Sequence, residues 1–304
     1  MRRRTPLRRI RHAAELIGLH SAMAVSRALD IDRASAFGSR LLRTLGPRTP
    51  LHATADGNLR RILPELDAAG RDRVLSGMWD NLGRLAFEFP HLRRLDPFCP
   101  QVAPLPDGTP RFELEGLEVV EGLRARGQCA VFASAHLANW EIGALVLTRA
   151  GMPMTYVYRQ ADNPWADDVI QGFRLEDAEF VRKRHAGRAL LDALQRGRSV
   201  GVVNDQKLTE GPLVDFLGVP AGTAPVVASL ALRAGLPVFP LRVERTGGAA
   251  FRVTVEPALP TPAECGTRRE RTLALLRSLN ARYSEWIRAR PEQWLWIHQR
   301  WPAG

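Results

Sequence analysis

The sequence predicts an α/β fold in which a mostly parallel central sheet is flanked by helices and preceded by a basic, helical N-terminal region. Two observations support this prediction. From Phe112 onward, short apolar runs alternate with segments of helical periodicity, a pattern typical of strand–helix–strand units in parallel sheets. Residues 1–50 instead have a helical composition rich in arginine, and they end in the helix-breaking run Gly46-Pro47-Arg48-Thr49-Pro50.

The individual elements are predicted in order from the periodicity of apolar residues and from helix breakers. Residues 57–95 are expected to form two helices separated by Pro64, and the proline-rich residues 95–110 to form a connector. Apolar runs predict strands over residues 129–134, 154–158, 199–204, 237–243 and 251–255. The segments between and after them predict helices over residues 139–149, 165–176, 187–196, 225–234 and 268–289.

A histidine and a glutamate flank the first of these strand-to-helix corners, in Ala133-Ser134-Ala135-His136-Leu137-Ala138-Asn139-Trp140-Glu141. Asn139 is expected to cap the helix that follows. In a regular helix two such positions would be rotated by about 140° and would not meet. At a corner between strand and helix, His136 can contact Glu141. A histidine with an orienting carboxylate is a general base able to deprotonate a hydroxyl.

A second polar pair, Asp205-Gln206, directly follows the predicted strand 199–204. In open α/β sheets, ligands bind outside the carboxyl ends of the strands. Because His136 also follows a strand, we expect His136 and Asp205 to lie at the same edge of the sheet. Capping of the strand end is an equally good explanation of the polar pair.

The order and spacing of several segments are informative as a set. After the His136 segment come Tyr156-Val157-Tyr158-Arg159, Gly172-Phe173-Arg174, Asp205-Gln206 and the tryptophan-rich string Pro291-Glu292-Gln293-Trp294-Leu295-Trp296-Ile297-His298-Gln299-Arg300-Trp301. From about Asn58 to Trp301, this pattern resembles the lipid A late acyltransferases, the lauroyl and myristoyl transferases of the lysophospholipid acyltransferase superfamily. The resemblance implies a glycerolipid acyltransferase-like fold, with residues 51–304 as the acyltransferase domain.

The resemblance also implies a reaction and the residues that perform it. A fatty acyl chain would pass from acyl-acyl carrier protein to a hydroxyl of a lipid A precursor, a step of lipopolysaccharide biosynthesis and lipid metabolism. His136 matches the catalytic base and Glu141 its acidic partner. Arginines would clamp phosphates or stabilise the oxyanion, and Asp205-Gln206 would bind the sugar or position a loop. The residues expected to bind substrate are Asn139, Arg159, Arg174, Asp205 and Gln206.

The net charge of +11 and the pI of about 10.8 favour acidic partners such as anionic lipid headgroups or an acidic carrier protein. No nucleic acid is expected, because the arginines are dispersed and no nucleic-acid-binding motif occurs.

The tryptophans of the C-terminal string are expected to pack in the core, with membrane contact as the alternative. No metal or other cofactor is expected, because the three cysteines, Cys99, Cys129 and Cys265, have no metal-binding spacing. Reduced thiols are expected.

The N-terminus carries a cluster of six arginines, Arg2, Arg3, Arg4, Arg8, Arg9 and Arg11. The residues that follow, 12–29, are interrupted by Glu15, His20 and Arg27 and are too polar for a spanning helix. We therefore expect residues 1–50 to associate with an anionic membrane surface, at the cytoplasmic face of the bacterial inner membrane. The family often has a longer apolar anchor here. A solvated arm followed by a packed helix is the alternative.

Three other functions remain open. A related enzyme of the same superfamily would share the chemistry but acylate a lysophospholipid, an ornithine lipid or a glycolipid of the phosphatidylinositol mannoside type. A basic protein that binds anionic lipid without catalysis is a second alternative. A serine hydrolase is a third and weaker one.

Overall fold

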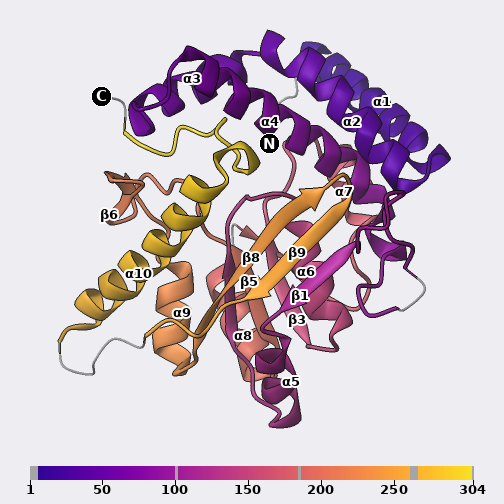
Figure 1. Ribbon diagram of the computed structural model, residues 1–304. Coiled ribbons are helices and arrows are strands. Elements are labelled where there is room, and N and C mark those ends of the chain that lie inside the picture. Colours follow the sequence, from indigo (N-terminus) through magenta and orange to yellow (C-terminus); the bar gives the residue numbers. More distant parts are fainter. Residues whose placement is uncertain (1–5, 100–101, 184–185, 261–265, 303–304) are drawn as a thin grey trace.

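A seven-stranded sheet forms the centre of the protein, with the strand order β1-β9-β8-β2-β5-β3-β4 (Figure 1). The computed structural model describes residues 6–99, 102–183, 186–260 and 266–302, of which residues 6–11 are described by their backbone alone. Neighbouring strands are parallel apart from the antiparallel pair β8 and β9. The predicted α/β fold with a mostly parallel sheet is therefore confirmed.

All five predicted strands are present, at β2, β3, β5, β8 and β9. Strands β1, β4, β6 and β7 were not predicted, because β1, β4 and β6 mix charged and apolar residues and β7 contains proline and glycine, so none forms an apolar run. Strands β1 and β4 are the two edges of the sheet, and β6 and β7 form a separate antiparallel pair. The bounds are β1 (Phe112–Glu115), β2 (Val131–Ser134), β3 (Met154–Tyr158), β4 (Glu179–Arg182), β5 (Ser199–Val203), β6 (Leu213–Phe216), β7 (Val219–Gly222), β8 (Val238–Gly247) and β9 (Ala250–Val255).

Helices cover both faces of the sheet. Strand β2 shows the division, because Val131 and Ala133 pack into one apolar cluster and Phe132 into another, as alternate side chains of a strand must. The cluster around Val131 includes α8 (Ala186–Gln195), α9 (Val226–Ala234) and α10 (Arg268–Ala289), and the cluster around Phe132 includes α5 (Leu117–Ala125) and α6 (Glu141–Arg149). Burial on both faces explains why β2 is a continuous apolar run.

The predicted helices correspond closely to those observed. Helix α10 has the predicted bounds and begins with a capping box formed by Thr267 and Glu270. Helix α7 (Pro164–Gln171) is shorter than predicted, and α6 begins at Glu141 instead of at residue 139. The expected capping of α6 by Asn139 is wrong, because the Asn139 amide donates to Glu88 at 2.8 Å instead.

A layer of N-terminal helices lies across one end of the sheet (Figure 1). It comprises α1 (Pro6–Ala28), α2 (Ile31–Leu45), α3 (Pro50–Ile62) and α4 (Ala68–Glu88), with short 3-10 turns at Gly46–Arg48 and Phe89–Arg94. Pro64 separates α3 from α4 as predicted, but α3 starts earlier, with Pro50 in its first turn. Helices α2 and α4 cross so closely that a Cβ on Gly38 would lie 2.2 Å from the Gly83 carbonyl oxygen.

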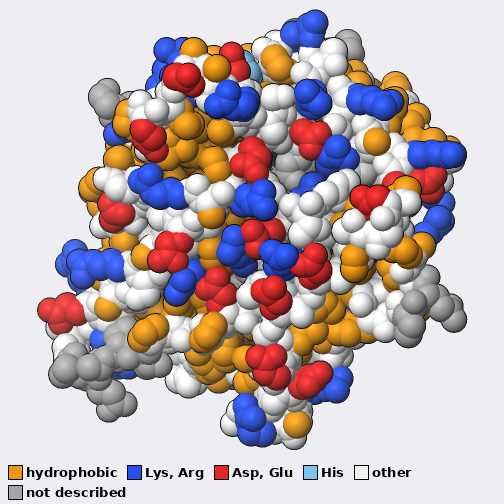
Figure 2. Space-filling model, viewed as in Figure 1, with side chains coloured by type: hydrophobic (Ala, Val, Ile, Leu, Met, Phe, Trp, Pro, Cys, Tyr) orange, Lys and Arg blue, Asp and Glu red, His pale blue; other side chains and the backbone are white. Residues whose placement is uncertain are grey.

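The predicted membrane-associating segment is only partly visible. Arg2, Arg3 and Arg4 lie outside the described residues, as do the side chains of Arg8, Arg9 and Arg11. Within the described ranges, no helix combines the length and the hydropathy required to cross a bilayer. On the face shown in Figure 2, basic and acidic side chains are interspersed with apolar ones, so the positive charge is not gathered into one patch there.

A buried ion pair joins the helical layer to the sheet. Arg245 of β8 contacts Glu88 at the end of α4 through two bonds of 2.6 and 3.0 Å, and both side chains are buried. Ser35 of α2 and Asn139 also donate to the Glu88 carboxylate, and Arg245 donates to Asn81 of α4. These partners satisfy a charge pair that burial would otherwise make costly.

Substituting Glu88→Gln leaves the guanidinium of Arg245 buried without a carboxylate, so we expect the free energy of unfolding to fall by about 3–5 kcal/mol. Urea-induced unfolding measures this change. Glu113→Gln is the matched control, because it breaks the half-exposed ion pair with Arg252, and a loss below about 1 kcal/mol is expected. Equal losses in the two variants would contradict the importance of the buried pair.

Candidate active site

The register of the sheet places His136 beside Asp205. Strands β2 and β5 are parallel, with Ser134 opposite Val203, and the two polar residues each lie two positions further along. The backbone N–H of His136 donates to Oδ2 of Asp205 at 3.0 Å, and Nδ1 of the ring lies 2.5 Å from Oδ1. The two residues therefore lie at the same edge of the sheet, as the sequence predicts.

The carboxylate that contacts His136 differs from the predicted one. Glu141 lines the same cavity as His136, but no hydrogen bond joins the two side chains within the described part of the chain. The parallel register brings Asp205 to the Nδ1 side of the ring. The loop toward Glu141 turns at Ala138, which has a positive φ of 48°. The predicted contact between His136 and Glu141 is thus replaced by a contact with Asp205.

The Asp205 carboxylate is fully buried and held by several donors. The indole of Trp294 donates to Oδ2 at 2.7 Å, in addition to the ring and backbone of His136. Burial alone would raise the pKa of Asp205. The charge of His136 and the hydrogen bonds from His136 and Trp294 outweigh burial and lower the pKa to about 2. Asp205 is therefore ionised at neutral pH and stabilises a proton on Nδ1 of His136.

The C-terminal segment packs against the loop that carries His136 and is hydrogen-bonded to it. Leu137 forms an isolated β-bridge with Trp294, and the N–H of Ala138 donates to the Gln293 carbonyl at 2.9 Å. Asn81 of α4 donates to the Ala138 carbonyl at 3.0 Å. These bonds hold the left-handed backbone of Ala138, which is unfavourable for a residue with a side chain. Trp294, Trp296 and Trp301 are buried, which confirms the expectation that this string packs in the core.

Gln206 connects His136 to a histidine that the sequence did not single out. Its amide nitrogen lies 3.1 Å from Nε2 of His136 and 2.9 Å from Nε2 of His298. Burial lowers the pKa of His298, and a proton on His136 would act in the same direction. The only feature of the sequence that could have indicated a role for His298 was its place within the tryptophan-rich string. Nothing in that string showed that the segment folds back onto His136.

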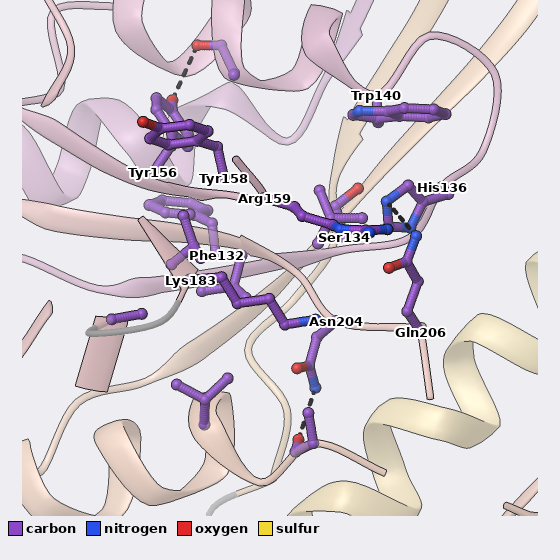
Figure 3. Close-up of a pocket in the computed structure, with 18 of the residues that line it drawn as sticks. Phe132, Ser134, His136, Trp140, Tyr156, Tyr158, Arg159, Lys183, Asn204 and Gln206 are labelled. Carbon is purple, nitrogen blue, oxygen red and sulfur yellow. Dashed lines mark hydrogen bonds between the residues drawn. The ribbon is translucent and has the colours of Figure 1, made fainter. Parts of the chain in front are cut away.

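A cavity of about 530 Å³ opens beside His136 (Figure 3). His136, Trp140 and Gln206 lie at one end of the view, and the aromatic side chains of Phe132, Tyr156 and Tyr158 lie at the other. Tyr156 is fixed there, because its hydroxyl donates to the Ala144 carbonyl at 2.9 Å. Gly201 leaves room for the Tyr156 ring, since a Cβ on Gly201 would lie 2.4 Å from it. The cavity thus combines a polar end with an aromatic, apolar end.

Both predicted arginines line this cavity. Arg159 lies at its exposed rim, 3.7 Å from Asp162. Arg174 lies against the rings of Tyr158 and Phe180, with its guanidinium carbon 4.7 and 4.5 Å from their centroids. The Nε of Arg174 is buried and has no hydrogen-bond partner in the described part of the chain.

Of the two other predicted residues in this segment, Glu141 lines the cavity and Asn139 does not. Burial raises the pKa of Glu141 above its usual range, although the charge of Arg174 opposes this shift. Glu141 faces the cavity, whereas Asn139 is fully buried and bonds to Glu88 outside it. Asn139 therefore does not reach the cavity in this structure, because its amide is used to hold the loop against α4.

The chain also contains a serine in a hydrolase-like pattern and three cysteines, which are the other candidate nucleophiles or metal ligands. Gly197-Arg198-Ser199-Val200-Gly201 has the Gly-x-Ser-x-Gly pattern of serine hydrolases. Ser199 lies inside β5, however, and its buried hydroxyl accepts a bond from the N–H of Ala130. Cys99 and Cys129 are free thiols, and Cys265 lies outside the described residues. Within the described ranges, no group of His, Cys, Asp and Glu side chains could hold a metal ion.

The pKa of Asp205 leads to a test by acid unfolding. Because the folded-state pKa of about 2 lies below the unfolded value of 3.8, the carboxylate stabilises the fold above pH 3.8, and this contribution is lost as the pH falls toward 2. We expect Asp205→Asn to lower the free energy of unfolding by about 2 kcal/mol near neutral pH and by progressively less below about pH 4. Asp192→Asn, at an exposed position on α8, is the control. A difference independent of pH would contradict this assignment.

Comparison with known proteins identifies the family. The model of the bacterial lipid A biosynthesis acyltransferase family matches residues 3–303. The chain is 26% identical over 203 residues to the lipid A biosynthesis acyltransferase of Haemophilus influenzae and 26% identical over 196 residues to the lipid A biosynthesis myristoyltransferase of Escherichia coli. Each match covers 62% of this chain and 58% of the relative, which is less than two thirds of either relative's length. The chain belongs to the bacterial lipid A biosynthesis acyltransferase family.

Proposed function

We propose that this protein is an O-acyltransferase that moves a fatty acyl chain from acyl-acyl carrier protein to a hydroxyl of a lipid A precursor. The observation that carries the proposal is the pair of His136 and Asp205 at the polar end of a largely apolar cavity, in a chain of this family. A histidine oriented by a buried carboxylate activates a hydroxyl, and an apolar cavity accommodates an acyl chain.

In the proposed reaction, His136 acts as the general base. Asp205 holds the proton on Nδ1, so Nε2 accepts the proton of the acceptor hydroxyl once that hydroxyl has replaced the Gln206 amide at the Nε2 lone pair. The hydroxyl oxygen attacks the thioester carbonyl carbon and forms the new C–O bond. When the tetrahedral intermediate collapses, the C–S bond breaks and the proton passes from Nε2 to the leaving sulfur. A covalent acyl-enzyme is not required, because the thioester is already activated.

We assign the remaining cavity residues supporting roles. Arg174, whose Nε has no partner in the described chain, would donate to the oxyanion or to a substrate phosphate. Glu141 would act on Arg174 and His136 through its charge, since it contacts neither by a hydrogen bond in the described structure. Arg159 and Gln206 line the same cavity and would bind the acceptor lipid there.

We further propose that residues 1–50 associate with an anionic membrane surface, at the cytoplasmic face of the inner membrane, while residues 51–304 form the acyltransferase domain. Two apolar residues of α1, Ile17 and Val25, are exposed and would enter the interfacial region of a bilayer. The net charge of +11 favours anionic headgroups and an acidic carrier protein. Because α2 packs against α4, the two regions would move as one unit.

The first test is acyl transfer by the purified protein in detergent, with acyl carrier protein and coenzyme A thioesters as donors. Acceptors are a tetraacylated lipid A precursor and a lysophospholipid. We expect transfer from the carrier thioester to the lipid A precursor, and a loss on the order of 10²–10⁴-fold or more in His136→Ala, because the general base is removed. His20→Ala, an exposed histidine on α1, should retain activity.

The outcomes of this assay separate the alternatives. Near-normal turnover by His136→Ala would reject the mechanism. Transfer restricted to the lysophospholipid would retain the mechanism and assign the protein to a related branch of the superfamily. If the folded wild-type protein transferred nothing, the non-catalytic lipid-binding function would be favoured.

The cavity wall predicts a change in chain-length preference. Ala144 lines the cavity on α6, and Ala144→Leu would occupy space that the distal methylenes of a long acyl chain need. We expect the ratio of kcat/KM for lauroyl over octanoyl donors to fall about 10-fold or more, since one methylene in a pocket is worth at least that factor. Ala144→Ser, of similar size, is the control. An unchanged ratio in Ala144→Leu would place the acyl chain elsewhere.

A further inference from the structure

A second imidazole lies next to His136 and shares a hydrogen-bond partner with it. The amide nitrogen of Gln206 lies 3.1 Å from Nε2 of His136 and 2.9 Å from Nε2 of His298. The ring centroids are 6.2 Å apart and the rings are inclined by 61°, so Gln206 bridges two rings from segments that are distant in the sequence. Figure 3 shows the amide of Gln206 directed at His136.

The chemistry of an amide nitrogen restricts the protonation of both rings. This nitrogen carries two hydrogens and only donates. Each Nε2 must therefore accept, which requires that neither Nε2 carries a proton. For His136, whose Nδ1 faces Asp205, this is the neutral tautomer that can accept a proton from a hydroxyl. The arrangement with two imidazole acceptors thus selects the tautomer of His136 in which Nε2 is unprotonated, and the acceptor hydroxyl replaces the Gln206 amide before Nε2 acts as a base.

The opposite orientation of the carboxamide would have the opposite effect. If the Gln206 amide rotated by half a turn, its Oε1 would face Nε2 of His136 and favour a proton there. With Asp205 accepting at Nδ1, His136 would then be held as an imidazolium, which is inactive as a base. A His298 that carries its proton on Nδ1 disfavours this rotation, because the rotated oxygen would face the lone pair of its Nε2.

We propose that His298 is a positioning residue for the catalytic base, which fixes the orientation of the Gln206 carboxamide and so keeps Nε2 of His136 unprotonated. The consequence for catalysis rests on the proposed acyl transfer. The position of the proton on His136 is independent of the proposed acyl transfer, because it can be measured in the free protein.

The surroundings of His298 suit this role. Asn58 of α3 donates to the backbone carbonyls of Trp296 and His298 at 2.7 and 2.8 Å, which holds the segment in place. Burial lowers the pKa of His298, and the charges of His136, Arg159 and Lys183 also lower it, against Asp205. His298 is therefore neutral at neutral pH, and with its proton on Nδ1 the Nε2 atom accepts from Gln206.

The other charged groups near the two rings come from every element that surrounds the site. In the described part of the chain, these groups include Asp205 after β5, Glu141 on α6, Arg159 after β3, Arg174 after α7, Lys183 after β4 and Arg300 of the C-terminal segment. None of them is altered by a substitution at His298, so a change in the titration of His136 would report the loss of the His298 acceptor.

Two substitutions at His298 separate a positioning role from a structural one. His298→Leu removes the acceptor, whereas His298→Gln can return one through its side-chain oxygen. Full-length protein labelled with ¹⁵N-histidine is titrated by NMR, and the Nε2 signal of His136 is identified by its absence in His136→Ala. The pH dependence of kcat/KM is measured on the same proteins. Gln299→Ala, at the exposed neighbouring position, is the matched control.

In His298→Leu we expect the midpoint for protonation of His136 to rise by about one pH unit, because a rotated amide oxygen forms a charge-assisted bond with the imidazolium. The acid limb of the kcat/KM profile should move by the same amount, so activity lost at neutral pH returns at higher pH. His298→Gln should restore both values, and Gln299→Ala should leave both unchanged.

An unchanged midpoint in His298→Leu, with activity reduced equally at every pH, would overturn the proposal. If His298→Leu does not fold, Gln206→Glu provides the second measurement, because it replaces the donor by a carboxylate of the same shape. We expect Gln206→Glu to raise the midpoint further, and an unchanged midpoint would again overturn the proposal. If the wild-type protein transfers no acyl chain, the proposed function fails, while the NMR titration still decides the role of His298.

Discussion

The buried carboxylate of Asp205 is the interaction on which the geometry of the site depends. An ionised carboxylate in the interior is costly unless donors surround it, and here the carboxylate and its donors come from three separate parts of the chain. The backbone and ring of His136 follow β2, Asp205 itself follows β5, and the Trp294 indole belongs to the C-terminal segment. Satisfying one charge therefore brings these segments together and fixes the orientation of the His136 ring.

A second buried charge, the carboxylate of Glu88, joins the N-terminal helices to the sheet and to the loop that carries His136. The Glu88 carboxylate accepts from Arg245 of β8, Ser35 of α2 and Asn139 of the loop that carries His136. Asn81, about two turns before Glu88 on the same face of α4, binds both Arg245 and the carbonyl of Ala138. The helical layer is consequently part of the support of the active-site loop, and displacement of α4 would disturb Ala138, whose left-handed backbone needs these bonds.

The sequence predicted those features that follow from local patterns. Strands β2, β3 and β5 were found because burial on both faces demands continuous apolar runs, and the edge position of His136 and Asp205 followed from their places after strands. The edge strands β1 and β4 were missed because their charged side chains face solvent and leave no apolar pattern. The partner of His136 was assigned to Glu141, five residues away, whereas Asp205, 69 residues away, forms the bond. Contacts set by sheet register or by a returning C-terminal segment, such as that of His298, leave no signal in a local window.

Trp294 and His298 follow every described strand of the sheet in the sequence, which has a consequence for biosynthesis. Ribosomes build the polypeptide from the N-terminus at about 5–20 residues per second, so the helical layer and all strands of the sheet are synthesised before the segment that donates to Asp205 and bridges to Gln206. A chain that terminates early, before Pro291, would contain His136 and Asp205 but lack the indole that buries and bonds the carboxylate. The order of translation thus delays the assembly of this site geometry until the segment with Trp294 and His298 has been synthesised.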